Sequence, residues 1–235
     1  MKKLVLVDFD DTLVETAPAF HGARGALFRK LEDEGFSQED IQRVHFDEVD
    51  PEFLKAHGMG PFRMAPSFRE TYQRLCSQFH RPVDPAVAEA CEALGRDFLG
   101  KPKVMDGSLE ALEALASSFP TVVFSQAAQK EYQMGRIRDA GVMGILKDHQ
   151  VRITERKTPE SFRNALLHFG VQDPSLAVMV GNSLRSDINP ALSAGSEAIL
   201  VEPYEMWHYD VVDPVSDDFL RFPSFSEAAA HLLRL

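Results

Sequence analysis

The chain has 235 residues, of which 44% are hydrophobic and 26% are charged, a composition typical of a globular protein and not of a disordered one. Its net charge of −11 repels nucleic-acid backbones and anionic membranes, which excludes a nucleic acid polymer or a membrane as the expected partner. No apolar run reaches the ~18 residues of a membrane span, and the first run is too short for a signal peptide. We therefore expect a cytoplasmic protein, with Cys76 and Cys91 as buried, reduced thiols.

Short apolar runs rich in β-branched residues predict the strands of a buried sheet. Between them lie helical patterns of period 3.6; one has Pro159 where a first turn tolerates proline and Gly170 where a C-terminal cap favours glycine. This alternation predicts an α/β fold with a doubly wound, mostly parallel, Rossmann-like sheet. The predicted strands are Leu4–Phe9, Thr121–Phe124, Ala177–Val180, Ala198–Val201 and Phe219–Phe222.

Residues 16–100 interrupt this alternation. They contain amphipathic helical patterns around Phe20–Leu31, Phe68–Phe79 and Val87–Phe98, and no convincing strand. We therefore predict an α/β core made of residues 1–15 and 101–235, with a helical domain inserted at 16–100.

Two acids lie at the end of the first predicted strand. Asp8 and Asp10 fall at the carboxyl edge of the sheet, where open α/β sheets bind ligands. The alternative explanation is a solvated turn in which Asp11 or Thr12 caps the next helix.

Three later strand or helix boundaries also carry polar groups. Ser125 closes the second predicted strand, Lys157 stands just before a helix start, and Gly181–Ser183 ends another strand, with Asp187 one turn later. Taken singly, these are explained as a helix cap, a solvated lysine and a glycine turn. Taken together, a carboxylate nucleophile, oxygen donors for magnesium and cationic or hydroxyl donors for phosphate oxygens suit phosphoryl transfer.

The ordered set resembles the four motifs of the haloacid dehalogenase-like hydrolases. The corresponding residues are Asp8–Leu13, then Ser125, then Lys157, then Gly181–Ser183 through Asp187. The resemblance covers the whole chain and includes a helical cap inserted after the first motif. It implies a Rossmann-like core and a phosphatase-type hydrolase.

The resemblance also implies a role for each motif. Asp8 would attack phosphorus and form an aspartyl-phosphate, while Asp10 would protonate the leaving oxygen and then activate water. Ser125 and Lys157 would hold the phosphoryl oxygens, and Gln126 is a further candidate for phosphate binding.

Mg²⁺ is the implied cofactor. Its ligands would be Asp8, the backbone carbonyl of Asp10 and the last motif, where the candidates are Asn182 and Asp187. The family's last motif usually begins Gly-Asp, whereas this chain has Gly181 followed by Asn182. An asparagine carbonyl can still bind a hard cation, but it supplies no negative charge.

Other functions are compatible with parts of this pattern. A dehalogenase does not need an acid at Asp10, a phosphonatase-like enzyme needs a Schiff-base lysine in its cap, and a phosphate-binding or phosphoacceptor regulatory protein would not turn over. We expect a small phosphorylated metabolite as substrate and a monomer or homodimer. The segment 55–63, with His57 and Arg63, is either a specificity loop or a surface turn between cap helices.

Overall fold

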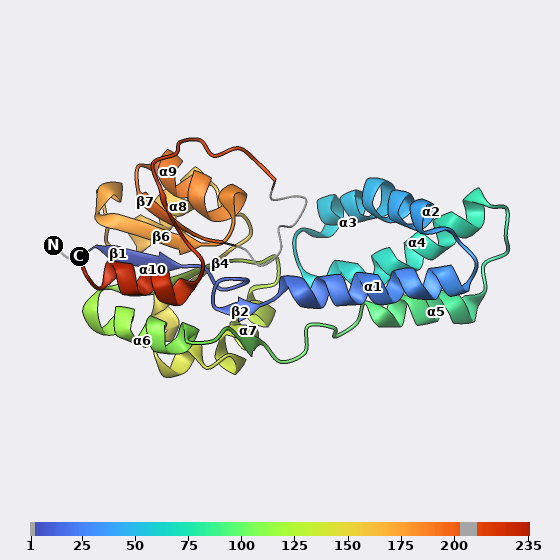
Figure 1. The fold of residues 1–235 in the computed structure, drawn as a ribbon, viewed down its shortest axis with the longest axis horizontal. Coiled ribbons are helices and arrows are strands. Elements are labelled where there is room, and N and C mark those ends of the chain that lie inside the picture. Colours follow the sequence, from blue (N-terminus) through green and yellow to red (C-terminus); the bar gives the residue numbers. More distant parts are fainter. Residues whose placement is uncertain (1–2, 203–210) are drawn as a thin grey trace. The chain divides into compact units, whose positions relative to one another are not determined.

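The structure, a computed structural model, describes residues 3–202 and 211–235. The chain folds into two compact units (Figure 1). The first, here called the core unit, consists of Met1–Ala17 and Lys101–Leu235. The second, here called the helical unit, consists of Pro18–Gly100.

The core unit is built on a six-stranded sheet in which every neighbouring pair of strands is parallel. The order is β5-β4-β1-β6-β7-β8, so the chain adds strands to one side of β1 and then to the other. Such a reversal beside the first strand opens a crevice at the carboxyl ends of the strands. The strands are β1 (Leu4–Val7), β4 (Thr121–Gln126), β5 (Val151–Thr154), β6 (Ala177–Gly181), β7 (Glu197–Val201) and β8 (Leu220–Phe222).

The predicted fold class and five of these strands are confirmed, with small shifts at their ends. β1 ends at Val7, two residues earlier than predicted, so that Asp8 already lies in the following loop. β5 was missed because it pairs with β4 alone and alternates apolar residues with Arg152 and Thr154, which leaves no continuous apolar run.

Helices cover both faces of the sheet. One hydrophobic cluster joins the sheet to α6 (Ser108–Ser118), α7 (Lys130–Asp139) and α10 (Phe225–Leu232). A second joins its other face to α8 (Pro159–His168) and α9 (Asn189–Ala194). Short helical turns lie between these elements, at Val142–Gly144, Asp148–Gln150, Pro174–Leu176 and Leu184–Ile188.

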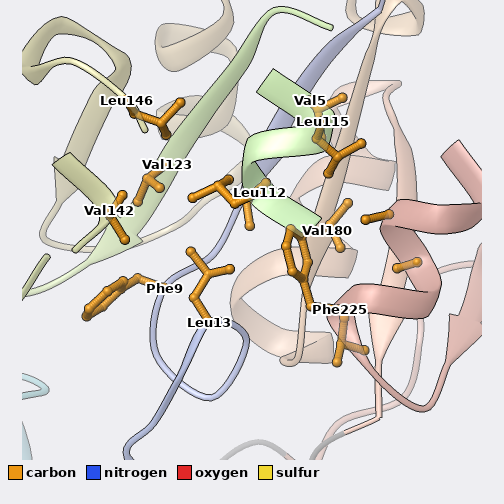
Figure 2. Packing of buried hydrophobic residues seen from close by; sticks show 14 of the residues in the cluster. Val5, Phe9, Leu13, Leu112, Leu115, Val123, Val142, Leu146, Val180 and Phe225 are labelled. Carbon is orange, nitrogen blue, oxygen red and sulfur yellow. The ribbon is translucent and has the colours of Figure 1, made fainter. Parts of the chain in front are cut away.

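Alternation along β1 feeds both clusters. Leu4 and Leu6 belong to the cluster under α8, and Val5 and Val7 to the cluster under α6. Full burial of each such side chain is worth roughly 1.5–3 kcal/mol, which fixes the register of the central strand and thereby the place of the loop after it. Figure 2 shows the cluster under α6, in which residues of three strands pack against α6 and α10. Its labelled residues include Val5, Val123, Val180, Leu112, Leu115 and Phe225.

The helical unit packs its helices around one apolar core. Cys76 and Cys91 lie in this core as free, buried cysteines, as predicted. Among its described residues, 18–100, there is no strand. The helices are α1 (Ala17–Asp33), α2 (Gln38–Gln42), α3 (Asp50–His57), α4 (Met64–Gln78) and α5 (Pro85–Leu94), with a π-helical segment at Arg43–Val49 and a 3-10 turn at Pro61–Arg63.

Helix ends in this unit follow the sequence signals. The Asp84 side chain caps α5 by accepting a hydrogen bond from the Ala86 backbone N–H at 2.8 Å, as expected from the Asp-Pro pair. Gly95, just after α5, lies so close to the start of α4 that a Cβ would stand 2.5 Å from the Ala65 nitrogen. A glycine is required there by this close approach.

A two-stranded antiparallel ribbon flanks the insertion in sequence. β2 (Val14–Glu15) precedes the helical unit and pairs with β3 (Lys103–Val104), which follows it. The Lys103 ammonium group donates to the Glu15 carboxylate at 2.8 Å. The two chain segments that lead to and from residues 18–100 are therefore tied together within the core unit.

Candidate active site

The motif residues of the core unit come from the carboxyl ends of neighbouring strands. Asp8 follows β1, Ser125 lies at the end of β4, and Asp187 lies in the turn after β6. Lys157 directly precedes Thr158, which caps α8 through a capping box. β1 is hydrogen-bonded to β4 on one side and to β6 on the other, which brings these side chains to one edge.

Lys157 is the centre of a buried ion cluster. Its Nζ donates to Asp8 Oδ1 at 2.5 Å and to Asp187 Oδ1 at 2.6 Å. The side chains of Lys157 and Asp187 are 1% and 0% exposed, and that of Asp8 is 10% exposed. Asp8 is thus the member of the cluster with access to solvent. We refer to these three residues as the core cluster.

The core cluster holds two carboxylates against one ammonium group, and the ionisation equilibria reflect this imbalance. Burial raises the pKa of the Asp8 carboxyl to about 8, with a further contribution from the charge of Asp187, and Lys157 opposes both effects. Burial alone would lower the pKa of Lys157, but the two carboxylates outweigh it and raise that pKa. The site would therefore accept an additional cation next to Asp8.

Backbone contacts fix the other members of the core cluster. The Ser183 backbone N–H donates to Asp187 Oδ2 at 3.0 Å, and Gly181 leaves room for this carboxylate, because a Cβ there would stand 2.4 Å from it. Gln126 accepts a hydrogen bond from the Lys157 backbone N–H at 2.7 Å. The side chain predicted to bind phosphate is therefore engaged, through its oxygen, in holding the lysine segment.

The turn after β1 is shaped by Asp11. Its φ of 54° is a left-handed conformation that aspartate tolerates better than most residues. Its carboxylate accepts hydrogen bonds from the backbone N–H groups of Thr16 and Ala17, each at 2.8 Å. Burial raises the pKa of Asp11 to about 6 although these two donors lower it. Asp11 thus caps the start of α1, as the alternative explanation of this turn required.

Asp10 is held by three donors from two parts of the core unit. Thr16 Oγ1 donates to Asp10 Oδ1 at 2.7 Å, and the Arg136 guanidinium donates to the same oxygen at 2.5 Å. Gln133 Nε2 donates to Asp10 Oδ2 at 2.5 Å and to Ser125 Oγ at 2.9 Å. Asp10 and Ser125 are therefore linked through a single amide group.

Sequence analysis did not identify Gln133 and Arg136. Both lie on α7, three residues apart, and both are buried, at 3% and 6% exposed. The available signal was this spacing on the helix that follows Ser125. Residue type gives no such signal, because Arg138 lies two residues further along the same helix and is 56% exposed.

The segment 55–63 does not form one loop in the helical unit. α3 extends to His57, which is exposed, and a 3-10 turn covers Pro61–Arg63, so only Gly58–Gly60 lies outside helical turns. Arg63 is 2% exposed, and its guanidinium forms an ion pair with Asp50. The structure thus agrees with the alternative of a turn between cap helices, at Gly58–Gly60, and a role of His57 and Arg63 in substrate specificity stays a prediction.

Comparison with known proteins agrees with this geometry. The family of haloacid dehalogenase-like hydrolases matches residues 2–195. The chain belongs to this family. No curated protein matches the chain. Solved structures match in fold, and both a phosphatase of Thermococcus onnurineus and a 2-haloacid dehalogenase of Pseudomonas syringae are among them.

Three of these structures cover nearly the whole chain. A haloacid dehalogenase-like hydrolase of Xanthomonas campestris has a TM-score of 0.80 at 22% identity, covering 99% of this chain and 92% of its own. Bacillus subtilis YfnB, bound to magnesium, has a TM-score of 0.63 at 18% identity, covering 100% and 99%. A family member from Deinococcus radiodurans with bound phosphate and sodium has a TM-score of 0.64 at 18% identity, covering 99% and 96%.

The oxygen donors of this haloacid dehalogenase-like hydrolase fit a hard divalent cation such as Mg²⁺. Asn182 Oδ1 lies 3.4 Å from Thr12 Oγ1, which brings the amide oxygen next to the loop that carries Asp8. The pKa of Asp8 is raised by burial and by the charge of Asp187, and a neighbouring cation would lower it again. Over residues 3–202 and 211–235 there is no cluster of three His, Cys, Asp or Glu side chains arranged for a metal, so carbonyl-type oxygens would have to complete the ligand set.

The described part of this hydrolase contains no helix long and apolar enough to span a membrane.

Proposed function

We propose that this chain is a magnesium-dependent phosphatase that hydrolyses a small phosphomonoester through an aspartyl-phosphate on Asp8. The observation that carries the proposal is the pairing of two differently held acids. Asp8 is bound to the buried ammonium group of Lys157, and Asp10, two residues on, is held by neutral and cationic donors at 27% exposure. This difference supports a nucleophilic role for Asp8 and an acid and base role for Asp10.

The first half of the reaction uses both acids. A carboxylate oxygen of Asp8 forms a bond to phosphorus while the bond between phosphorus and the leaving oxygen breaks. Asp10 gives its proton to that oxygen, which departs as an alcohol. Lys157, within hydrogen-bond distance of Asp8, offsets the repulsion between the nucleophile and the anionic substrate.

The second half regenerates the enzyme. Asp10, now a carboxylate, takes a proton from water as the water oxygen bonds to phosphorus, and the bond to Asp8 breaks to release inorganic phosphate. Ser125 and Lys157 hold the phosphoryl oxygens in both halves. A bound Mg²⁺, with Asp8, the Asp10 backbone carbonyl and Asn182 as ligands, would neutralise phosphate charge. Asp187 would hold Lys157 through Oδ1, and with two of its about four acceptor sites occupied it stays the other candidate magnesium ligand of this motif.

Asp10 is also the reason to prefer phosphate ester hydrolysis over dehalogenation. An alkoxide leaving group needs a proton, whereas a halide does not, and a carboxylic acid placed two residues after the nucleophile serves only the former. The charge of −11 supports a small phosphorylated metabolite and not a nucleic acid polymer. A dehalogenase would instead release halide from a 2-haloacid in a parallel assay.

The experiment is a screen of purified protein with magnesium against a panel of phosphorylated metabolites, with inorganic phosphate measured over many turnovers. Asp8→Asn should abolish release, and Asp139→Asn, which changes an exposed acid of α7, should leave it unchanged. Asp10→Asn should lower hydrolysis of alkyl phosphates by ~10²–10⁴-fold. Release of one equivalent of the alcohol per protein, without release of inorganic phosphate, would indicate a phosphoacceptor protein, and retained activity in Asp8→Asn would exclude the covalent mechanism.

A further inference from the structure

The side chain of Asp10 is enclosed by a ring of hydrogen bonds within the core unit. Arg136 donates to Asp10 Oδ1 through one guanidinium nitrogen and to Thr16 Oγ1 through another, the latter at 3.0 Å. The first of these nitrogens also lies 3.2 Å from Gln133 Oε1. Arg136, Gln133 and Thr16 therefore fix one another as well as the carboxylate, and the orientation of Asp10 is determined by the core unit alone.

Among residues 3–202 and 211–235, the hydrogen bonds of the ring leave one acceptor position on Asp10 unoccupied. A carboxylate offers about four lone-pair sites, two on each oxygen. Thr16 and Arg136 occupy both sites of Oδ1, and Gln133 occupies one site of Oδ2. The remaining site, on Oδ2, is the place for a transferable proton, and the 27% exposure of the side chain gives it access to solvent.

The ring is not explained by the packing of the fold. Arg136 is 6% exposed and its guanidinium carbon lies 5.5 Å from the centre of the Phe9 ring, so its charge has been withdrawn from water at a cost. Replacing a buried ion pair by apolar side chains is often neutral or stabilising. A ring that only stabilised α7 against the sheet would not need to end on an acid that is more exposed than its donors.

We propose that Arg136 and Gln133 are positioning residues for the proton transfers of Asp10. Resting on the proposed phosphatase function, the inference assigns Oδ2 as the oxygen that gives its proton to the leaving group and later takes one from water. Gln133 sets the distance between this oxygen and the phosphate-binding Ser125, because its Nε2 bonds to both. The proton balance of the reaction is unchanged, since the ring donates hydrogen bonds and exchanges no proton with substrate.

The test compares Arg136→Met with a matched control, Arg138→Met, which removes an exposed arginine from the same helix. Two substrates separate the two halves of the reaction: an alkyl phosphate, whose leaving group needs a proton, and p-nitrophenyl phosphate, whose leaving group does not. For Arg136→Met we expect kcat on the alkyl substrate to fall by ~10–100-fold, below the full loss of an acid catalyst. KM should change by less than about threefold, because positioning of the acid affects the transition state and not substrate binding.

On p-nitrophenyl phosphate the same variant should release one equivalent of nitrophenol in a burst, followed by a slow steady state. The reason is that the aspartyl-phosphate still forms on Asp8, but its hydrolysis needs a correctly oriented Asp10. A purely structural role for Arg136 would lower both halves together and give no burst. Equal kcat for the Arg136→Met and Arg138→Met proteins, or a change confined to KM, would overturn the inference.

Gln133→Met provides the second variant, in case Arg136→Met does not fold. It keeps side-chain length while removing the amide that joins Asp10 to Ser125. It should show the same burst on p-nitrophenyl phosphate, and Arg136→Lys, which keeps the charge, should recover part of the lost kcat. A Gln133→Met protein without a burst would count against the inference. Absence of phosphate turnover in the unaltered protein would instead reject the proposed function itself.

Discussion

Each of the two compact units buries one cluster of charged side chains, and the two clusters have opposite composition. In the core unit one ammonium group, that of Lys157, lies between the carboxylates of Asp8 and Asp187. In the helical unit one carboxylate, that of Asp50, lies between two guanidinium groups. The first cluster carries a net negative formal charge and the second a net positive one.

The cluster of the helical unit consists of Arg24 on α1, Asp50 at the start of α3 and Arg63 at the end of the 3-10 turn. Arg24 Nη2 lies 3.5 Å from Asp50 Oδ2, and Arg63 pairs with Asp50 Oδ1. The three side chains are at most 6% exposed. The cluster joins three segments that are separated in sequence, and it therefore specifies how they pack.

The difference lies in where the charges can act. The Asp8 side chain is 10% exposed at the ends of the strands, and its pKa is raised to about 8, so the fold does not fully compensate the charged form of this carboxyl. Such uncompensated charge is typical of functional sites, where stability is lower than an apolar replacement would give. Asp50 is fully buried between its two partners, as expected of a group whose contribution is structural.

Asp50→Asn tests this contrast with the largest expected effect on stability. The variant removes the carboxylate with which both guanidinium groups pair, and breaking a buried pair costs about 3–5 kcal/mol. Hydrogen exchange measured by mass spectrometry should show loss of protection in α4 and α5, which form the core of the helical unit.

The control for this variant is Asp40→Asn. Asp40 also pairs with an arginine, Arg43, but its side chain is 30% exposed, and exposed pairs are worth only ~0–1 kcal/mol. Equal protection in the two variants would show that the Asp50 cluster does not specify the packing of the helical unit.

Asp8→Asn should have the reverse effect on stability. In the folded protein the Asp8 carboxyl keeps its proton up to about pH 8, whereas in the unfolded chain it loses it near the ordinary value of 3.8. Between these pH values the folded state binds more protons than the unfolded state. The contribution of Asp8 to the free energy of unfolding therefore falls as the pH rises. Asparagine removes this dependence.

The metal-free variant should therefore be more stable than the unaltered protein at about pH 8, by about 1–2 kcal/mol, and nearly equal to it below pH 4. For a chain of this length, each kcal/mol of added stability raises Tm by ~2–4 °C. Thermal unfolding with chelator at several pH values measures it. A gain that did not grow with pH would contradict the assignment of an uncompensated charge to Asp8, and the exposed Asp139→Asn change should show no such trend.

The two clusters also differ in whether their residues could be identified from the sequence. Asp8, Lys157 and Asp187 each follow or precede an element whose end is marked by apolar runs, glycine or proline, and parallel strands bring such ends together. Arg24 and Arg63 lie within helical turns, and nothing in their residue type or in their position along the sequence distinguishes a buried arginine from a solvated one. Only the fold distinguishes them.

The same reason accounts for Gln133 and Arg136 and for β5. The spacing of Gln133 and Arg136 places them on one face of α7, but it does not show that this face turns toward Asp10, because packing against the sheet sets the orientation of the helix. β5, as an edge strand, lacks the double burial that gives inner strands continuous apolar runs. The alternation of strands and helices was therefore enough to predict the fold class, and the strand ends were enough to predict the position of Asp8, but neither indicates the residues that hold Asp10.

The last and smallest expected effect concerns Asn182, the position at which the last motif departs from the family pattern. Its amide oxygen lies beside Thr12, in the loop that carries Asp8 and Asp10. Asn182→Asp adds a charge worth ~4 kcal/mol to a cation at 4 Å, before desolvation and repulsion from Asp8 are subtracted. We expect these opposing effects to leave a decrease of about threefold to tenfold in the half-saturating magnesium concentration.

Asn164→Asp, which adds the same charge on an exposed position of α8, is the matched control. Titration of activity with magnesium distinguishes the two sites. The same half-saturating concentration in both variants would show that residue 182 does not sense the metal, so that its amide serves only the turn after β6.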